Sequence, residues 1–265
     1  MIFALIAIGI LICAYLLFFC ENRRFVVRRT EIAHKKVVNP FTVVQISDLH
    51  DKRFGAGQEK LMQAIRDAKP DRIVITGDLF NRKNKNAYRN AFSLVNQCVR
   101  IAPVFFSEGN HECALGDAGE AYIKAIGDAG VHVLRDEFVD SGPVRFIGLK
   151  QYAEPEKLAS MLSCEKLNVV LAHRPERFPL YAGTGADVIL SGHAHGGQVR
   201  LFDIGLYAPE QGVFPKYTSG IYTIDKSLMY VSRGLGNTVI VPRVFNTPEL
   251  DVLSFKPEKT DFRSV

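Results

Sequence analysis

A glycine-rich segment, Ser191-Gly192-His193-Ala194-His195-Gly196-Gly197-Gln198, directly follows the apolar run Val188-Ile189-Leu190. In an extended backbone, side chains two positions apart lie on the same side, so we expect His193 and His195 to face one point. Two neutral imidazoles at the end of a buried strand form a metal-ligand pair, and the small neighbours leave room for ions and a substrate. The alternative interpretation is a glycine-rich turn with two exposed histidines.

The chain upstream of this segment alternates between buried strands and amphipathic helices. Apolar runs predict strands at 41–46, 72–76, 104–107, 144–149, 169–172 and 188–190, and helices at 57–68, 86–101, 118–129 and 154–163. Downstream, short strands at 220–224, 228–232 and 250–255 are separated by Gly, Pro and Asn. The pattern predicts an α/β domain with a mostly parallel sheet in its first half and a second sheet packed on it.

The first residues form an unbroken apolar run at 2–20, about 28 Å long as a helix, which nearly matches the thickness of a bilayer core. We therefore expect a transmembrane anchor at 1–20, a membrane-proximal linker at 21–40, a catalytic domain at 41–256 and a tail at 257–265. A secretory signal peptide is the alternative, but no basic residue precedes the run.

Basic residues are concentrated in the linker, which carries +4 of the formal net charge of +5. The positive-inside rule then predicts a single-pass protein of the cell membrane with a cytoplasmic catalytic domain. The linker charge suits anionic lipid headgroups, and a near-neutral remainder argues against a nucleic-acid partner. The five cysteines form no CxxC pair, so neither disulfides nor thiolate metal sites are expected.

Polar clusters follow the predicted strands, at the sheet edge where ligands of α/β proteins usually bind. The candidates are Asp48, His50, Asp78, Asn110, His111, His173, His193 and His195. Imidazole, carboxylate and amide donors without a thiolate suit Mn, Fe or Zn in a site with open positions. The set is too large for one ion, which indicates two. Asp78 is the natural bridge, because two divalent cations 3.5–4 Å apart repel by about 19 kcal/mol at an effective dielectric near 20.

The motifs Asp48-Leu49-His50, Gly77-Asp78, Gly109-Asn110-His111-Glu112, His173 and Gly192-His193-Ala194-His195 occur in the order typical of calcineurin-like metallophosphoesterases. The chain resembles this family over about 41–255. The resemblance implies a four-layer αββα sandwich, preceded here by the expected transmembrane helix, with two divalent metal ions.

The resemblance also implies roles for single residues. The first ion would be held by Asp48, His50, Asp78 and His195, and the second by Asp78, Asn110, His173 and His193. A hydroxide between the ions would attack phosphorus, while His111 acts as general acid and Glu112 fixes its tautomer. The alternative for His111 and Glu112 is a helix-capping turn.

Three further residues border this motif set. Many family members have an acidic residue three positions after the bridging Asp, where this chain has Asn81, so the ligands are expected to be oriented differently. Arg82 is interpreted as a contact to a phosphate oxygen or as a solvated surface residue. Arg233, within a Ser232–Gly236 turn that resembles the bacterial membrane-associated group typified by YkuE and YaeI, either lines the substrate cleft or only forms the turn.

These observations together predict a membrane-anchored, metal-dependent phosphoester hydrolase. Its position at the bilayer favours a lipid-linked phosphodiester or pyrophosphate as substrate, for instance a UDP-diacylglucosamine, and the aromatic loop 202–217 is a candidate for contact with an acyl chain. The alternatives are a catalytically weak binding scaffold of the same fold and a nucleic-acid or nucleotide phosphodiesterase. The sequence contains no feature that fixes an oligomeric state.

Overall fold

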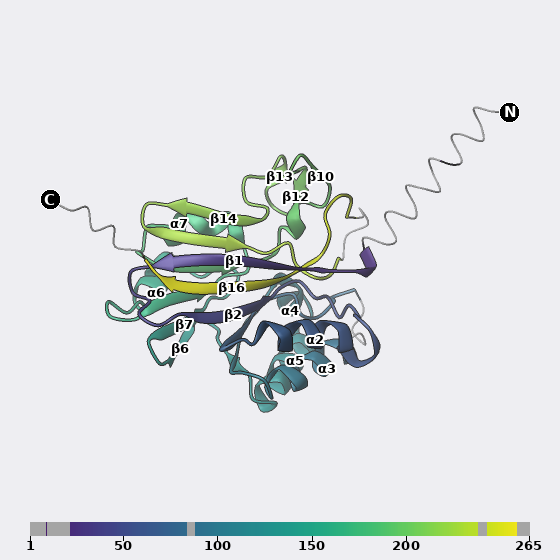
Figure 1. Cartoon of the computed structure of the whole chain (residues 1–265), viewed down its shortest axis with the longest axis horizontal. Coiled ribbons are helices and arrows are strands. Elements are labelled where there is room, and N and C mark those ends of the chain that lie inside the picture. Colours follow the sequence, from purple (N-terminus) through teal and green to yellow (C-terminus); the bar gives the residue numbers. More distant parts are fainter. Residues whose placement is uncertain (1–8, 10–21, 84–87, 238–242, 259–265) are drawn as a thin grey trace.

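Two six-stranded sheets face each other in the computed structural model, which describes residues 9, 22–83, 88–237 and 243–258. Figure 1 shows the two sheets with helices below the first sheet and beside the second. Apart from Gly9, the expected transmembrane segment lies outside the described residues. Within the part of the chain that is described, no helix is both long enough and apolar enough to cross a bilayer.

The first sheet contains the strands that precede the first three polar clusters. Its strand order is β1 (Val26–His34), β16 (Glu249–Pro257), β2 (Phe41–Ile46), β3 (Arg72–Thr76), β4 (Val104–Ser107) and β5 (His132–Val133). Strands β2 to β5 are parallel, and β16 runs antiparallel to β2. Buried residues of α2 (Glu59–Ala68), α3 (Arg89–Cys98) and α5 (Asp117–Asp128) pack on its outer face.

The second sheet is mixed and contains the strands that precede His173 and His193. Its order is β14 (Gly220–Ile224), β15 (Ser227–Val231), β9 (Val188–Ser191), β8 (Leu167–Leu171), β7 (Val144–Gly148) and β6 (Glu137–Ser141). The short helices α6 (Pro155–Ala159) and α7 (Phe178–Ala182) cover its outer face. The predicted helix at 154–163 is thus shorter than expected.

Each sheet forms one apolar core with the helices on its outer face, and the inner faces of the two sheets form a third core between them. Phe105 of β4 stacks on Phe146 of β7 with ring centroids 4.1 Å apart. Along β2 the side chains alternate, so that Val43 faces the opposite sheet and Val44 faces the helices. The order of layers is helix, sheet, sheet, helix, as the family resemblance implied.

The main correction concerns the segment predicted as a linker at 21–40. Residues 26–34 form β1, which pairs in parallel with β16 along its whole length. Its pattern of charged residues hides the strand, because β1 is an edge strand and only Ile32 is buried. The predicted tail at 257–265 begins inside β16, and residues 259–265 lie outside the described part.

Short elements complete the end of the molecule that carries the polar clusters. They are η1 (Ala56–Gln58), α4 (Asn110–Ala114), η2 (Pro175–Arg177), η3 (His195–Gly197), and two hairpins, β10 (Arg200–Leu201) with β11 (Ile204–Gly205) and β12 (Tyr207–Ala208) with β13 (Gly212–Val213). The hairpins lie near this end, above the second sheet in Figure 1.

Candidate metal centre

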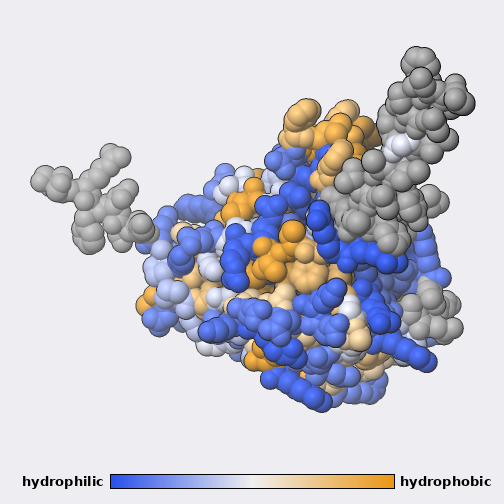
Figure 2. Space-filling view, turned by 45° about the vertical axis from the view of Figure 1, so that its right-hand side comes forward, coloured by the Kyte–Doolittle hydropathy of each residue, from blue (hydrophilic) through white to orange (hydrophobic). Residues whose placement is uncertain are grey.

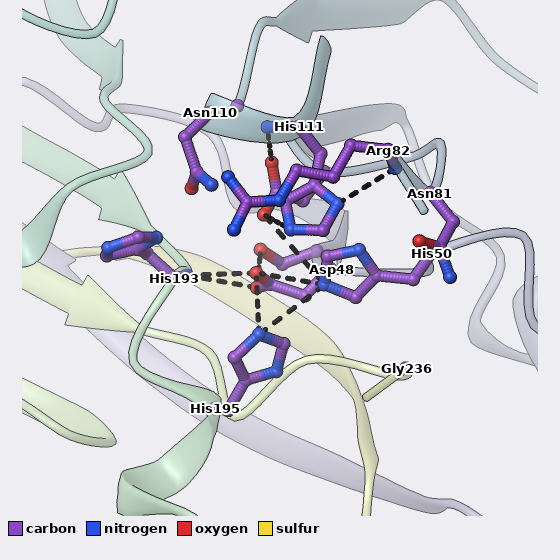
Figure 3. Close-up of polar contacts among 12 residues, drawn as sticks. Asp48, His50, Asn81, Arg82, Asn110, His111, His193, His195 and Gly236 are labelled. Atoms are coloured by element: carbon purple, nitrogen blue, oxygen red, sulfur yellow. Dashed lines mark hydrogen bonds and ion pairs between the residues drawn. The ribbon is translucent and has the colours of Figure 1, made fainter. Parts of the chain in front are cut away.

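The polar clusters meet at one end of the sandwich, as the strand order predicted. Asp48 follows β2, Asp78 follows β3 and Asn110 follows β4, while His173 and His193 follow β8 and β9 of the other sheet. All but Asn110 are buried. In Figure 3, the side chains of Asp48, His50, His111 and His195 lie close together, while Asn81 points away from them.

Left-handed backbone conformations, and not extended strands, aim these side chains. The φ angles are 50° for both Asp48 and His50, 51° for Asp78, 66° for His193 and 45° for His195. The expectation that alternation along a strand would orient the histidine pair is therefore wrong. Asp and His tolerate positive φ better than most residues, and such strained positions concentrate at functional sites.

Asp48, His50 and His195 form the first group of donor atoms. Nε2 of His50 and Nε2 of His195 are 3.4 Å apart, and both lie within 4.0 Å of Oδ1 of Asp48. Ser47 donates to Oδ2 of Asp48 over 2.6 Å, and the backbone N–H of His193 also donates to the carboxylate. Two ring nitrogens that face each other need a proton or a cation between them.

Asp78, His173 and His193 form the second group. Nε2 of His173 lies 3.2 Å from Nδ1 of His193, 3.4 Å from Oδ2 of Asp78 and 3.2 Å from Oδ1 of Asn110. The other ring nitrogen of His173 is 2.7 Å from the carbonyl of Thr76, which fixes the ring. Three of the four predicted ligands of the second ion thus belong to this group, and Asn110 contacts it.

Asp78 connects the two groups. Its Oδ2 lies 3.8 Å from Nε2 of His50 and 3.4 Å from Nε2 of His173. The backbone N–H of His111 donates to the other carboxylate oxygen over 2.8 Å. A ligand shared by two metal ions must lie close to the other ligands of both ions. Asp78 meets this requirement, because its carboxylate lies near imidazoles of both groups.

Two glycines leave the space that the carboxylates occupy. A Cβ on Gly109 would lie 2.1 Å from Oδ1 of Asp78, and a Cβ on Gly192 would lie 2.4 Å from Oδ2 of Asp48. Both contacts are far below any normal separation. Glycine is therefore required at these two positions because the backbone lies directly against a carboxylate, and not because the backbone adopts a positive φ.

Burial and charge set the protonation of the site. Burial, reinforced by neighbouring positive groups, lowers the pKa of His50 to about 3 and lowers those of His193 and His195 well below the usual value. Burial also opposes the charge of His173, but the carboxylate of Asp78 outweighs it and raises that pKa to about 9. Buried carboxylates thus draw positive charge to the centre, while three imidazoles keep free lone pairs.

The donor set therefore fits divalent metal ions. In each of the two groups, the ligand atoms lie within 4.8 Å of one another, and every member is buried. Nitrogen and carboxylate donors with neutral imidazoles are the ligands of Mn, Fe and Zn in catalytic sites.

Glu112 differs from its predicted role. Its carboxylate accepts the backbone N–H groups of Gly109, Asp78 and Phe80 over 2.7, 2.8 and 3.0 Å. The ring of His111 instead accepts the backbone N–H of Arg82 at Nδ1 over 3.2 Å, so this N–H fixes the tautomer. The expectation that Glu112 orients His111 is corrected, because Glu112 holds the loop after β3 to the start of α4, as in a capping turn.

The two predicted substrate-binding arginines lie in different places. A cavity of about 140 Å³ is lined by Asp78, Arg82, Asn110, His111, His193, His195, Pro209 and Glu210. Arg233 is not among these residues, and its side chain lies near Glu249 and Asp203 at 3.6 and 3.8 Å. This position favours the turn interpretation of Arg233. Asn81 accepts the backbone N–H of Lys83 over 3.0 Å.

Sequence analysis gave no role in the site to two charged residues that touch the histidine pair, although Pro242-Arg243 is part of the resemblance to the YkuE and YaeI group. Oε2 of Glu210 lies 2.8 Å from Nε2 of His193 and also contacts Arg174. A guanidinium nitrogen of the buried Arg243 lies 3.2 Å from Nδ1 of His195. Both come from loops far along the chain, and a charged residue in such a loop gives no signal of its partner.

Several curated proteins similar to this chain are named as phosphoesterases or pyrophosphatases. The metallophosphoesterase Cj0846 of Campylobacter jejuni is 28% identical over 245 residues, which cover 88% of this chain but only 64% of that protein. The Escherichia coli phosphodiesterase YaeI is 29% identical, with 83% of this chain and 84% of YaeI covered. The UDP-2,3-diacylglucosamine pyrophosphatase LpxG of Chlamydia muridarum is 24% identical, with 80% and 82% covered.

A solved structure shares the fold. The sulfate thiohydrolase SoxB of Thermus thermophilus matches with a TM-score of 0.51 at 13% identity, over 81% of this chain and 56% of SoxB. Residues 41–197, more than half of the chain, match the family described as calcineurin-like phosphoesterase. The chain therefore belongs to the calcineurin-like phosphoesterase family and is a hydrolase of that family.

Proposed function

We propose that this protein is a membrane-anchored phosphodiesterase or pyrophosphatase that uses two divalent metal ions, Mn, Fe or Zn. The observation that carries the two-metal part of the proposal is the position of Asp78, which belongs to the second group of donors and also lies near the first, 3.4 Å from His173 and 3.8 Å from His50. A carboxylate between two imidazole sets is the arrangement that paired cations need to offset their repulsion.

The residues divide between the two ions by proximity. Asp48, His50 and His195 would hold the first ion, His173, His193 and Asn110 the second, and Asp78 both. When bound, the ions would polarise the phosphoryl oxygens and make a water molecule acidic enough to be a nucleophile near neutral pH. Glu210, on the far ring nitrogen of His193, accepts its Nε2–H and so leaves the Nδ1 lone pair for the centre.

His111 is the proposed donor to the departing oxygen. Because Nδ1 accepts the N–H of Arg82, the proton of the neutral ring is on Nε2, which faces the cavity 4.0 Å from Oδ2 of Asp78. Burial lowers the pKa of His111, which also favours the neutral ring. In this conformation the ring stabilises the leaving oxygen by a hydrogen bond, and full protonation of the ring requires release of the Arg82 N–H.

The substrate class is inferred from charge and from the relatives. Arg82 lines the cavity and can neutralise a phosphoryl oxygen that the ions do not contact. The name of LpxG describes a pyrophosphatase of a diacylated UDP-sugar, and YaeI is named a phosphodiesterase. The apolar run at 2–20 would hold the catalytic domain on the cytoplasmic side of the membrane. A substrate at that surface would be a lipid-linked phosphodiester or pyrophosphate.

Two substitutions test the assignment of the metal ligands and the donor. Asp78→Ala should abolish turnover and lower the bound metal measured by elemental analysis. His111→Ala should lower kcat by about 10²- to 10⁴-fold while both ions remain bound. The assay compares aryl monoesters, aryl diesters and a UDP-linked lipid in the presence of manganese. Loss of metal from His111→Ala would contradict the roles proposed here.

A further inference from the structure

The two hairpins above the metal centre expose a cluster of large apolar side chains. Of the 14 exposed large hydrophobic residues in the described part of the chain, six lie within 201–214, and Phe202 is 98% exposed. These six, the hairpin patch, are Leu201, Phe202, Ile204, Tyr207, Val213 and Phe214. Figure 2 shows an apolar area at the top of the molecule, where these hairpins lie. Single exposed apolar residues are ordinary, but a contiguous group indicates an interaction surface.

Two aromatic residues of the patch, Phe202 and Phe214, adopt a backbone conformation that is unfavourable for them. Phe202 and Asp203 connect β10 to β11 with φ angles of 49° and 65°, and Phe214 has a φ of 52°. Such turns usually contain Asn or Gly, and a bulky residue at positive φ is a true outlier. Because Phe202 is almost fully exposed, packing within the monomer does not compensate for this conformation.

The patch is tied directly to the metal centre. The N–H of Leu206 donates to the carbonyl of Gly197 over 3.1 Å, and a Cβ on Gly197 would lie 2.4 Å from the Cα of Gly205. Pro209 and Glu210, between β12 and β13, line the cavity of the centre. A surface that binds the patch therefore lies at the mouth of this cavity.

The chain enters the domain at the same end. Asn22 donates to the carbonyl of Arg243 over 3.1 Å, and the side chain of Arg243 contacts His195 in the centre. The apolar run 2–20 ends two residues before Asn22, and the exposed Arg23 and Arg24 follow it. A segment long enough to span a bilayer, basic residues and the exposed aromatic hairpins are thus connected to one end of the molecule.

We propose that the hairpin patch inserts into the interfacial layer of an anionic phospholipid bilayer and holds the cavity mouth at headgroup level. Aromatic and aliphatic side chains combined with exposed basic residues, here Arg24 where the chain enters the domain and Lys216 just after β13, have the chemistry of interfacial binding, with burial to about 5–10 Å. The inference rests on the membrane anchoring in the proposed function and deepens it. Besides the anchor, a second contact fixes the orientation of the domain.

The absence of tryptophan from the sequence allows a direct test. Phe202→Trp in the full chain introduces a single probe, and Phe214→Trp is a second probe if the first variant does not fold. Phe138→Trp is the matched control, because Phe138 is 43% exposed on β6, the edge strand farthest from β14 in the second sheet. Each variant is reconstituted into vesicles of phosphatidylcholine and phosphatidylglycerol, with and without brominated acyl chains.

Insertion predicts that the emission of the Phe202→Trp probe shifts to the blue and is quenched by brominated lipid, while the Phe138→Trp probe does neither. Equal quenching of both probes, or of neither, overturns the proposal. A blue shift without quenching also overturns it and indicates a protein contact such as a second copy of the chain.

Hydrolysis of bis(p-nitrophenyl) phosphate with manganese in the same vesicles measures the phosphoesterase activity separately. Quenching without hydrolysis contradicts the proposed function and leaves docking in place, whereas hydrolysis without quenching contradicts docking alone. Flotation of the vesicles tests the anchor, and a chain that does not float with them overturns both anchoring and docking.

Discussion

Replacing Glu112 by Gln should destabilise the fold without changing the ionisation of His111. The two carboxylate oxygens of Glu112 accept three backbone N–H groups, two at Oε2 and one, from Phe80, at Oε1. The amide of Gln has one oxygen acceptor and one NH₂ donor. The amide of the Glu112→Gln side chain can adopt two orientations. In the more favourable one, its oxygen accepts the N–H groups of Asp78 and Gly109, and its NH₂ group faces the N–H of Phe80, which then has no acceptor.

The cost follows from this count of hydrogen bonds. One buried N–H without an acceptor costs about 1–3 kcal/mol of the free energy of unfolding. In a domain of this size each kcal/mol lowers Tm by about 2–4 °C. The opposite orientation of the amide leaves two N–H groups unpaired and costs about twice as much, so the Glu112→Gln side chain should adopt the first.

Thermal unfolding in the presence of a chelator measures this cost without the contribution of metal binding. The dependence of kcat on pH provides the second measurement, because a residue that orients His111 would shift the limb set by the ionisation of that ring. We expect a lower Tm and an unchanged pH profile. An unchanged Tm with a shifted profile would show that Glu112 acts on His111, which is the role that the family resemblance implied.

Three further predictions concern the space beside the Asp78 carboxylate, the orientation of the His193 ring and the reactivity of the Cys113 thiol. Gly109→Ala places a Cβ 2.1 Å from a buried carboxylate oxygen and should lower the metal content, whereas the control Gly127→Ala, with its nearest contact at an ordinary 3.6 Å, should retain it by elemental analysis. Glu210→Ala should weaken manganese affinity by about 10- to 100-fold in a titration, because His193 loses the partner of its far nitrogen, and an unchanged affinity would exclude that role. Burial and nearby acidic groups raise the pKa of Cys113 to about 12, so its alkylation followed by mass spectrometry should be slow at pH 8 and faster above pH 11, and rapid labelling at pH 8 would refute this.

The sequence was sufficient for the strands that lead into the centre and for the donors that follow them. Apolar runs such as those of β3 and β4 are local signals, and a polar cluster after each parallel strand has to lie at the same sheet edge. By contrast, β1 has too few buried residues to be distinguished from a charged linker. Its pairing with β16 connects residues more than 200 positions apart.

By itself, therefore, the sequence determined the kinds of ligand, their order and the presence of two packed sheets, because these depend on local hydrophobic patterns and on general rules of sheet topology. The four-layer arrangement was implied by the family resemblance. Only the tertiary structure decided how the ligands are aimed. The left-handed turns at Asp48 and His193 meet across 145 positions of sequence, where the N–H of His193 donates to the Asp48 carboxylate. Glu112 accepts the N–H groups of Asp78 and Phe80, more than 30 positions away, and Glu210 contacts His193 from a hairpin 17 positions further along the chain. A side chain gives no sign in the sequence of the distant backbone group that will bind it, because folding alone brings the two together.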